Sequence, residues 1–480
     1  MIKTFLRDSV IYAIPTLFSR GLALLLIPLY TRVLTPAEYG SFDLLMVFAA
    51  VINLTVALEV SQALARFYPD SSESQQRRYA SSAFWFAAAC YGLFVILALS
   101  FHAPLSRLVM GQNGLEWSFI LGVLYIGTNG LFYLVHNQFR WSLRSRSYAL
   151  ISLLVTSVTT LISVWLAYFL TMGIDGLLIG MLSGTVVGLL AGLWGLRNRI
   201  GWVFDWNYLR RMLAFSAPLV PSGVAVWLST YIDRMMVNYY LSVDDVGIYG
   251  MGVRLASVAT LLMVGFQGAL TPLIYRHYKE IQTPAALARI FRLFVALALL
   301  LWTTVSLFAT GLIELLTTPQ YYASHSIVVY LLPAVLLAQM YIFTPGIGIA
   351  KKTHWFLWIN AGGAVTNLFF NWILIPLWGI KGAAVATLAS YLVVFIAFLL
   401  VGQRLYYVPH SWGRLVLALF GSIGLIWTGL MLPLFYDSFF VANIMLIICV
   451  SCLIKACGLV TSQDLNVLRS WLSRQRSSVF

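Results

Sequence analysis

The sequence predicts an all-α polytopic membrane protein whose chain crosses the bilayer fourteen times. Hydrophobic residues make up 61% of its 480 residues and charged residues only 10%, whereas soluble domains carry about 25% charged residues on a solvated surface. Apolar stretches of about twenty residues, the length that spans the hydrocarbon core, recur along the whole chain. No polar stretch is long enough to form a separate catalytic or nucleic-acid-binding domain, so both of these classes are excluded.

The apolar stretches define fourteen candidate spans joined by short polar loops. Arg20 interrupts the first span and no small-residue cleavage site follows, so a retained first helix is expected in place of a signal peptide. The predicted bounds are Val10–Leu34, Phe42–Leu64, Ser81–Phe101, Trp117–Gln138, Tyr148–Leu170, Leu177–Leu196, Phe215–Tyr239, Gly247–Pro272, Ile290–Thr310, Ile327–Ala350, Trp355–Leu377, Gly382–Gly402, Leu415–Pro433 and Phe439–Cys457.

The net charge of +14 follows the side of the membrane on which each loop lies. Of the 30 lysines and arginines, 24 fall on the side that holds both chain ends, three lie on the opposite side and three lie within spans. Because Lys and Arg are enriched in cytoplasmic loops, both termini are expected in the cytoplasm. Topology therefore explains the basic balance, and no nucleic-acid partner is expected.

The chain repeats itself at an offset of about 207 residues. Leu34–Phe42 aligns with Leu241–Tyr249, and Gly173–Gly176 aligns with Gly379–Gly382. A duplicated unit of six helices enters the membrane in the same direction twice, which predicts two parallel lobes with the substrate between them. The expected organisation is an N-lobe (1–200, spans 1 to 6), a C-lobe (201–404, spans 7 to 12), two additional helices (405–460) and a cytoplasmic tail (461–480).

Charges within spans are the strongest local signals, because each one is costly unless it faces a partner or a wet cavity. They fall in the first two spans of each lobe, and they are Arg20, Glu59, Asp233, Arg234 and Arg254. Arg20 lies near the midplane, where it either faces a substrate cavity or forms a structural ion pair, with Glu59 as one candidate partner. His136 lies near the inner end of its span, where snorkelling or a loop role is expected.

Trp227, Tyr231 and Arg234 share one face of the seventh span, at positions i, i+4 and i+7. Such a face suits sugar rings and phosphate, through stacking and charge-assisted hydrogen bonds. A packed aromatic face near the outer interface, where Trp and Tyr are common, is the equal alternative. Asp233 points away from this face and is expected to be structural, paired with Arg254 or another base.

Other polar motifs are assigned structural roles. Asp244 and Asp245 resemble half of a metal site, but the aligned turn of the first lobe holds a single acid, so a helix-capping turn is preferred. Cys449 and Cys452 are interpreted as small apolar residues on one helix face. The sequence has no phosphate-binding loop and no hydrolase or metalloprotease motif. We therefore expect a transporter with no catalytic residues, no metal and no organic cofactor.

Three segments resemble the polysaccharide-export branch of the multidrug/oligosaccharidyl-lipid/polysaccharide superfamily, and in particular the O-antigen flippases. Their order and spacing carry the resemblance, since each consists of turn and packing residues. They are Arg20–Leu22 through Pro28–Gly40; Pro218–Pro221 with Asp233, Arg234 and Val246–Tyr249; and Lys351–Thr353 with Asn367, Asn371, Ile375, Pro376 and Gly379–Ala384.

The resemblance implies two six-helix lobes around a V-shaped cavity that opens to each side in turn. It implies a flippase of the bacterial inner membrane that moves undecaprenyl-diphosphate-linked oligosaccharides, with Arg20, Arg234 and Arg254 as candidates for holding the diphosphate. Glu59 and Asp233 are candidates for charge pairing or for coupling to H⁺ or Na⁺. The polysaccharide polymerase and glycosyltransferases of the same pathway are candidate partners.

Two other classes stay open at this point. An ion-coupled exporter of small amphipathic molecules, of the multidrug branch, would favour acids in the first lobe, whereas the excess within the spans is arginine. A membrane glycosyltransferase or polymerase would need a sizeable external loop, and every predicted external loop is short.

Overall fold

The computed structural model describes residues 18, 21–22, 25–68, 71–142, 144–263, 266, 270, 274, 277–350, 352, 354–431, 439–462 and 464. All regular structure within these residues is helical. The chain divides into two compact units. The first unit comprises Met1–Met251, Leu316–Ala323 and Ala364–Ala383, and the second comprises Gly252–Leu315, Ser324–Gly363 and Ala384–Phe480. The lobe boundaries inferred from the repeat stay predictions.

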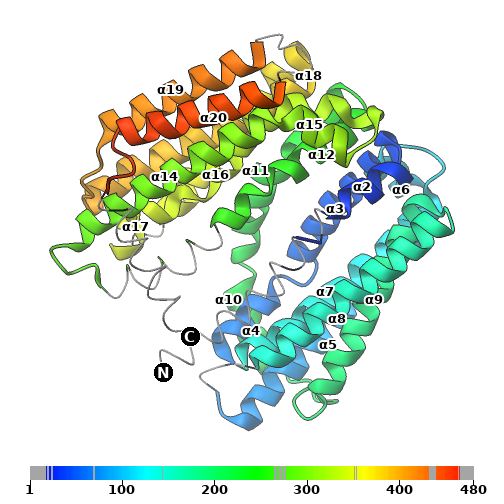
Figure 1. Ribbon diagram of the computed structural model, residues 1–480. Helices are drawn as coiled ribbons and strands as arrows, with labels where there is room; N and C mark the ends of the chain where they lie inside the picture. The colour runs from blue at the N-terminus through cyan, green and yellow to red at the C-terminus, as the bar shows by residue number, and fades with distance from the viewer. Residues whose placement is uncertain are drawn as a thin grey trace, which may run out of the picture. The chain divides into compact units, whose positions relative to one another are not determined.

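The first unit is a helical bundle in which α5, α7, α8 and α9 lie alongside one another (Figure 1). Buried apolar side chains form two clusters, one around α3, α7 and α9 and one around α4, α5 and α10. Its helices are α2 (Ile27–Val33), α3 (Pro36–Thr55), α4 (Val60–Phe67), α5 (Glu73–Ser100), α6 (His102–Met110), α7 (Glu116–Trp141), α8 (Ser145–Val164), the π-helix η1 (Trp165–Phe169), α9 (Gly173–Gly195), α10 (Trp206–Ser216) and α11 (Leu219–Tyr240).

Helix α9 packs against its neighbours through glycines spaced four residues apart. A Cβ atom on any one of them would approach an atom of α7, α8 or η1 to between 2.0 and 2.6 Å, so no larger residue fits without moving a helix. Small residues at this spacing let helix backbones approach closely inside a membrane. The stripe consists of Gly176, Gly180, Gly184, Gly188 and Gly192.

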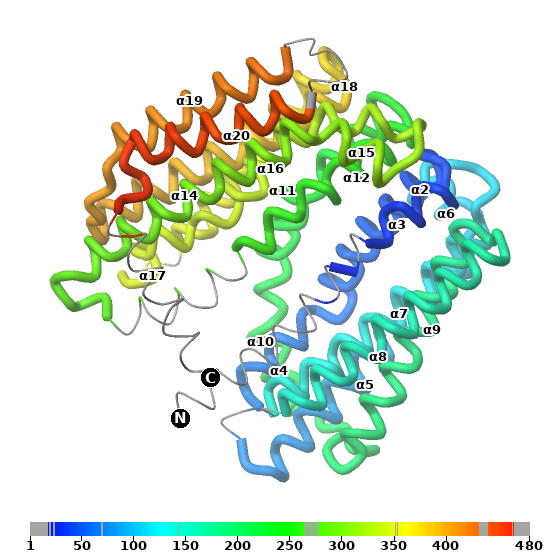
Figure 2. The backbone as a smooth tube through the Cα atoms, viewed as in Figure 1, coloured from blue at the N-terminus to red at the C-terminus, as the bar shows by residue number. Residues whose placement is uncertain are grey.

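In the second unit α14 packs against α16, α19 and α20, which run alongside it in Figure 2. Helix α12 (Val243–Ala256) crosses the boundary between the units, as do α15, η2 and α18. The remaining elements are α14 (Thr283–Leu307), α15 (Ala309–Leu316), the 3-10 helices η2 (Pro319–Ser324) and η3 (Met340–Phe343), α16 (His325–Gln339), α17 (Gly346–Ile349), α18 (His354–Leu405), α19 (Trp412–Met431) and α20 (Phe439–Ala456).

Ten helices in the described part of the chain are long and apolar enough to cross a membrane. An eleventh crossing is added if α10 and α11, which are bent by 44° at their junction, form one span. Helix α18 holds two predicted spans, and most of the first predicted span lies outside the described residues. The all-helical, multi-pass architecture is confirmed, while the number fourteen and the cytoplasmic ends stay predictions.

The segments that repeat in the sequence adopt matching local structures. Thr35 and Glu38 form a capping box at the start of α3. At the equivalent position of α12, the Asp245 N–H donates to Ser242 Oγ (3.1 Å) and the Ser242 hydroxyl donates to Asp245 Oδ2 (2.6 Å). Asp245 therefore serves as the helix cap that the sequence predicted. The aligned Gly173 and Gly379 both have left-handed backbones, with φ of 55° and 59°, which only glycine adopts readily.

The chain beyond α20 is attached to α14 through Asp464. Its carboxylate accepts a hydrogen bond from Arg289 (2.5 Å) and one from Arg292 (3.0 Å), and the N–H of Thr461 donates to it at 2.9 Å. Burial raises the pKa of Asp464, but the hydrogen bonds from Thr461 and Arg289 outweigh it, so this pKa lies below its ordinary value. The charged form is therefore the one that the folded protein stabilises.

Replacing Asp464 with asparagine should lower stability by about 1–2 kcal/mol at neutral pH, a value reduced because Arg289 is partly exposed. Since the folded pKa lies below the unfolded value of about 3.9, this stabilisation is complete above that value and disappears as pH falls through the folded pKa. Thermal unfolding of Asp464→Asn and wild type between pH 3 and pH 7 tests this. A difference that persists unchanged at pH 3, or one shared by the exposed-acid control Glu314→Gln, would contradict it.

Candidate functional site

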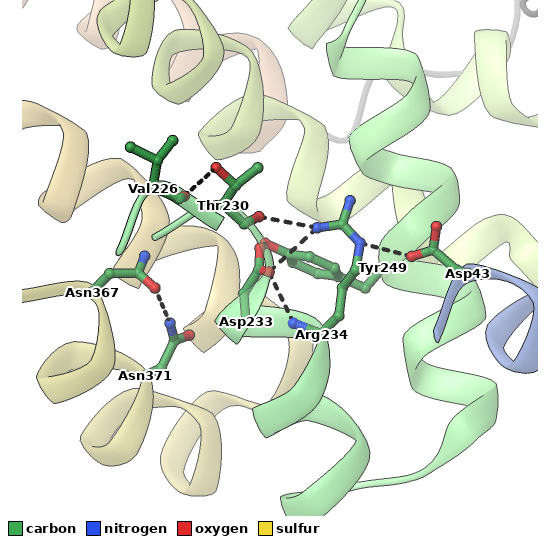
Figure 3. Close-up of polar contacts among 8 residues, drawn as sticks. All are labelled: Asp43, Val226, Thr230, Asp233, Arg234, Tyr249, Asn367 and Asn371. Atoms are coloured by element: carbon green, nitrogen blue, oxygen red, sulfur yellow. Dashed lines mark hydrogen bonds and ion pairs between the residues drawn. The ribbon is translucent and has the colours of Figure 1, made fainter. Parts of the chain in front are cut away.

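The candidate site is centred on Arg234, a buried arginine of α11 that faces α3 (Figure 3). Its Nε donates to Asp43 Oδ2 of α3 at 2.7 Å, and its Nη1 contacts Asp233 Oδ1 at 3.3 Å and the Thr230 carbonyl at 3.4 Å. The side chains of Arg234 and Asp233 are 9% and 7% exposed, and that of Asp43 is 20% exposed. One guanidinium therefore serves two carboxylates in an environment largely shielded from water.

Asp233 is held by three donors. The Tyr249 hydroxyl of α12 donates to its Oδ2 at 2.6 Å, and the Arg234 N–H and guanidinium donate to its Oδ1. The expectation that Asp233 is structural fits this arrangement, and the base that pairs with it is its neighbour Arg234. The sequence assigned the two residues to different faces of the helix, but the long guanidinium side chain folds back over the turn and reaches both acids.

The aromatic residues predicted to share a face with Arg234 do so. The Trp227 and Tyr231 ring centroids are 6.2 Å apart, and the Arg234 guanidinium carbon lies 5.4 Å from the Tyr231 ring centroid. The Trp227 indole N–H donates to the Val47 carbonyl of α3 at 3.1 Å. In this conformation the face is packed against α3, as the packing alternative predicted, while its use for sugar or phosphate stays a prediction.

Helices α3 and α12 cross beside this site at two repeat-equivalent glycines. A Cβ on Gly40 would lie 2.0 Å from the Val243 carbonyl oxygen, and a Cβ on Gly247 would lie 2.0 Å from the Pro36 carbonyl oxygen. A Cβ on Gly250 would in turn lie 3.1 Å from Asp43 Oδ2. The absence of side chains at these positions allows the two backbones to touch and brings Asp43 to Arg234.

A second polar pair belongs to the first-unit segment of α18. Asn371 Nδ2 donates to Asn367 Oδ1 at 2.9 Å, and the two residues are 0% and 1% exposed. Figure 3 draws this pair on the side of α11 opposite to Asp43. The sequence used both asparagines only for the family resemblance, although amides buried within an apolar span are themselves a signal of a polar site.

The other predicted charges do not join the Arg234 cluster in the described residues. Arg20 lies outside the described residues. Arg254 is half-buried on α12 and belongs to the second unit. Glu59 lies in the turn between α3 and α4, where the structure breaks the second predicted span.

The prediction for His136 is wrong. This residue is 8% exposed, its Nε2 lies 3.0 Å from the Tyr148 carbonyl, and its ring stacks between Phe132 and Tyr148. Its side chain points between α7 and α8 and not toward the membrane surface. Aromatic stacking and one carbonyl compensate the imidazole for the loss of water, so snorkelling is not needed.

Asp43 is the residue of the site that the sequence did not single out. It lies one residue inside the predicted start of the second span, where an acid can be explained by proximity to water. The repeat held a signal that could have found it, because Asp43 aligns with Gly250 at the offset of 207. A carboxylate at one copy and a glycine at the other indicates a contact that needs a charge on one side and space on the other.

Comparison with known proteins agrees with the resemblance seen in the sequence. A family model described as "Polysaccharide biosynthesis protein" matches residues 29–326. Lsg locus putative protein 1 of Haemophilus influenzae is 22% identical over 285 residues, which cover 57% of this chain and 67% of that protein. Succinoglycan biosynthesis transport protein ExoT of Rhizobium meliloti is 24% identical over 263 residues, and the match spans 52% of this chain and half of that protein.

Solved structures share the fold at low sequence identity. Lipid II flippase MurJ in an inward closed conformation superimposes with a TM-score of 0.75 at 14% identity, covering 93% of this chain and 98% of that one. An inward-facing multidrug resistance transporter of the MATE family gives a TM-score of 0.64 at 17% identity, covering 82% of this chain and 97% of that one.

Proposed function

Because the chain belongs to the polysaccharide biosynthesis protein family, we propose that it is a flippase for undecaprenyl-diphosphate-linked oligosaccharides. In this proposal the repeat units of an O-antigen or exopolysaccharide pass from the inner to the outer leaflet by alternating access. Family, relatives and fold identify the chain as a multi-pass membrane transporter of the multidrug/oligosaccharidyl-lipid/polysaccharide superfamily, and not as an enzyme. The lipid-linked oligosaccharide is the proposed part.

The observation that carries the proposal is the family match over residues 29–326, which include the whole Arg234–Asp43–Asp233 cluster. Two further observations support it. One relative is described as a transport protein of succinoglycan biosynthesis, and the fold is that of a protein described as a lipid II flippase. A lipid-linked sugar is the substrate class that these descriptions have in common.

Arg234 supplies the chemistry that a diphosphate headgroup needs. A guanidinium binds carboxylate and phosphate oxygens through the same paired N–H groups. When α3 separates from α11, Arg234 loses Asp43 and becomes available to a diphosphate, while Asp233 and Tyr249 keep its backbone in place. Arg20 and Arg254 are further candidates for the headgroup, and the rings of Trp227 and Tyr231 are candidates for the first sugars.

The substrate would reach the chain in the inner leaflet of the bacterial inner membrane. Glycosyltransferases must build the sugar on its lipid carrier, and a polymerase must consume the translocated unit, so both are proposed pathway partners. A coupling ion, H⁺ or Na⁺, is compatible with this scheme. The shared fold with a multidrug transporter keeps one alternative open, an ion-coupled exporter of small amphipathic molecules.

A deletion strain of the native host distinguishes the two functions. Loss of the gene should abolish the surface polysaccharide and leave lipid-linked repeat units in the inner leaflet, and a plasmid copy should restore the polysaccharide. Resistance to cationic dyes should not change. Normal polysaccharide together with lost dye resistance would overturn the flippase in favour of the exporter.

A further inference from the structure

A polar cavity of about 250 Å³ lies within the first unit, apart from the Arg234 cluster. It is bordered by α3, α4, α5 and α7 and by the turn that joins α3 to α4. Most of its wall is formed by small and apolar side chains. The polar groups that line it are Asn53, Glu59, Ser61, Tyr91, Asn129 and Tyr133.

The chain is strained where it enters this cavity. Leu58 and Glu59 have φ of 47° and 52°, the left-handed region that side chains other than glycine's rarely adopt. Residues 56–59 form a turn that interrupts the helical hydrogen bonds between α3 and α4. In membrane transporters, a span broken in this way places polar backbone and side-chain oxygens around a bound ion.

Two oxygens in the cavity wall have no hydrogen-bond partner among the described residues. They are Asn53 Oδ1, an acceptor, and Ser61 Oγ, which belongs to a residue that is 8% exposed. Buried polar atoms without partners are rare, because removing them from water is costly unless another group replaces the water. The Tyr91 hydroxyl is engaged elsewhere, since it donates to the Asn53 carbonyl at 3.3 Å.

Glu59 is the charged side chain among the described residues that line the cavity. The Gln62 side chain hydrogen-bonds to it, and the phenols of Tyr91 on α5 and Tyr133 on α7 lie close enough to interact with its charge. Cys90 and Arg140 act on these two tyrosines from α5 and α7. The wall itself therefore combines one carboxylate with neutral oxygens and contains no basic group to balance the carboxylate.

We propose that this cavity is a binding site for one alkali-metal cation, with Na⁺ as the ion it fits. Oxygen ligands are the ones that hard cations prefer, and the wall offers them from Asn53, Glu59 and Ser61, with Asn129 and Tyr133 also in reach. A single carboxylate matches a single positive charge, whereas divalent sites recruit more acids. The volume exceeds that of several waters at about 30 Å³ each, so water completes the coordination shell.

The site is defined by ion binding and does not depend on the identity of the transported lipid. The test is equilibrium binding of radioactive ²²Na⁺ to the purified full-length protein in detergent, without any lipid-linked sugar. Unlabelled Na⁺, K⁺, Mg²⁺ and choline serve as competitors. The wild type should bind Na⁺ saturably, and unlabelled Na⁺ should compete at least tenfold better than Mg²⁺ or choline.

Variants locate the ion within the molecule. Glu59→Gln should weaken Na⁺ binding at least tenfold or remove one bound Na⁺ per chain, while the same substitution at the exposed Glu314 should change nothing. Ser61→Ala removes an unpartnered hydroxyl, so without Na⁺ it should melt no lower than wild type. It should, however, lose most of the stabilisation that Na⁺ gives to the wild type.

Each opposite outcome overturns the proposal. These outcomes are no saturable Na⁺ binding by wild type, unchanged binding by Glu59→Gln, or an unchanged Na⁺-dependent shift in Ser61→Ala. If Glu59→Gln fails to fold, the Ser61→Ala comparison alone decides. Failure of this test would leave the flippase proposal standing, because that proposal is measured with the lipid substrate.

Discussion

Arg234→Gln should unfold at a markedly lower temperature than wild type and should lose transport. The substitution leaves Asp43 and Asp233 buried without their shared cation, and breaking a buried pair in this way costs about 3–5 kcal/mol. The measurements are the thermal unfolding midpoint in detergent and the rate at which labelled lipid-linked oligosaccharide crosses the bilayer of reconstituted liposomes. Arg211→Gln, the same change at an exposed position of α10, should match wild type in both.

A double substitution separates the structural role of Arg234 from its proposed role in binding the headgroup. Arg234→Gln with Asp43→Asn removes the uncompensated carboxylate of α3 and should recover much of the stability. It should not recover transport, because no guanidinium is left for the diphosphate. Full recovery of transport in the double variant would show that Arg234 is only a structural ion-pair partner.

Gly40→Ala should prevent the close approach of α3 and α12. The added Cβ would lie 2.0 Å from the Val243 carbonyl oxygen, a backbone atom that cannot move away as a flexible side chain could. Overpacking of this kind costs about 1–3 kcal/mol, and it also pulls Asp43 away from Arg234. The expected result is a lower unfolding midpoint and a transport rate reduced at least tenfold, with Gly247→Ala behaving alike.

Gly92→Ala is the matched control, since a Cβ there meets nothing within 4 Å. Alanine also favours a helix over glycine, so this variant should be at least as stable as wild type. If Gly40→Ala and Gly92→Ala gave the same midpoint and the same transport rate, the contact between α3 and α12 would have no part in the transport cycle.

The positions of the helices were predictable from the sequence because apolar length and loop charge are local properties. The duplicated turns at Leu34–Phe42 and Leu241–Tyr249 were also predictable, and their capping residues occupy equivalent places in the structure. The break at Leu58 and Glu59 was not, because neither glycine nor proline marks it. Only the packing of α4 against α5 and α10 explains why the helix stops there.

The site itself was predictable only in part. Charge within a span identified Asp233 and Arg234, and helical spacing placed Trp227 and Tyr231 beside them. The partner Asp43 is 191 residues distant from Arg234 in the chain, and no local pattern predicts a contact over that distance. The glycines that permit this contact are ordinary in composition, and their role appears only when α3 and α12 are seen to cross.

Leaflet exchange in liposomes tests the central claim most directly. Undecaprenyl-diphosphate-linked oligosaccharide, labelled on its sugar, is placed in both leaflets, and a reagent that cannot cross the membrane destroys the label outside. With the wild-type protein the label in the inner leaflet should also become accessible, whereas in protein-free liposomes and with Arg234→Gln about half should stay protected. Equal protection with wild type and without protein would contradict the account, as would free passage of a cationic dye with no movement of the lipid-linked sugar.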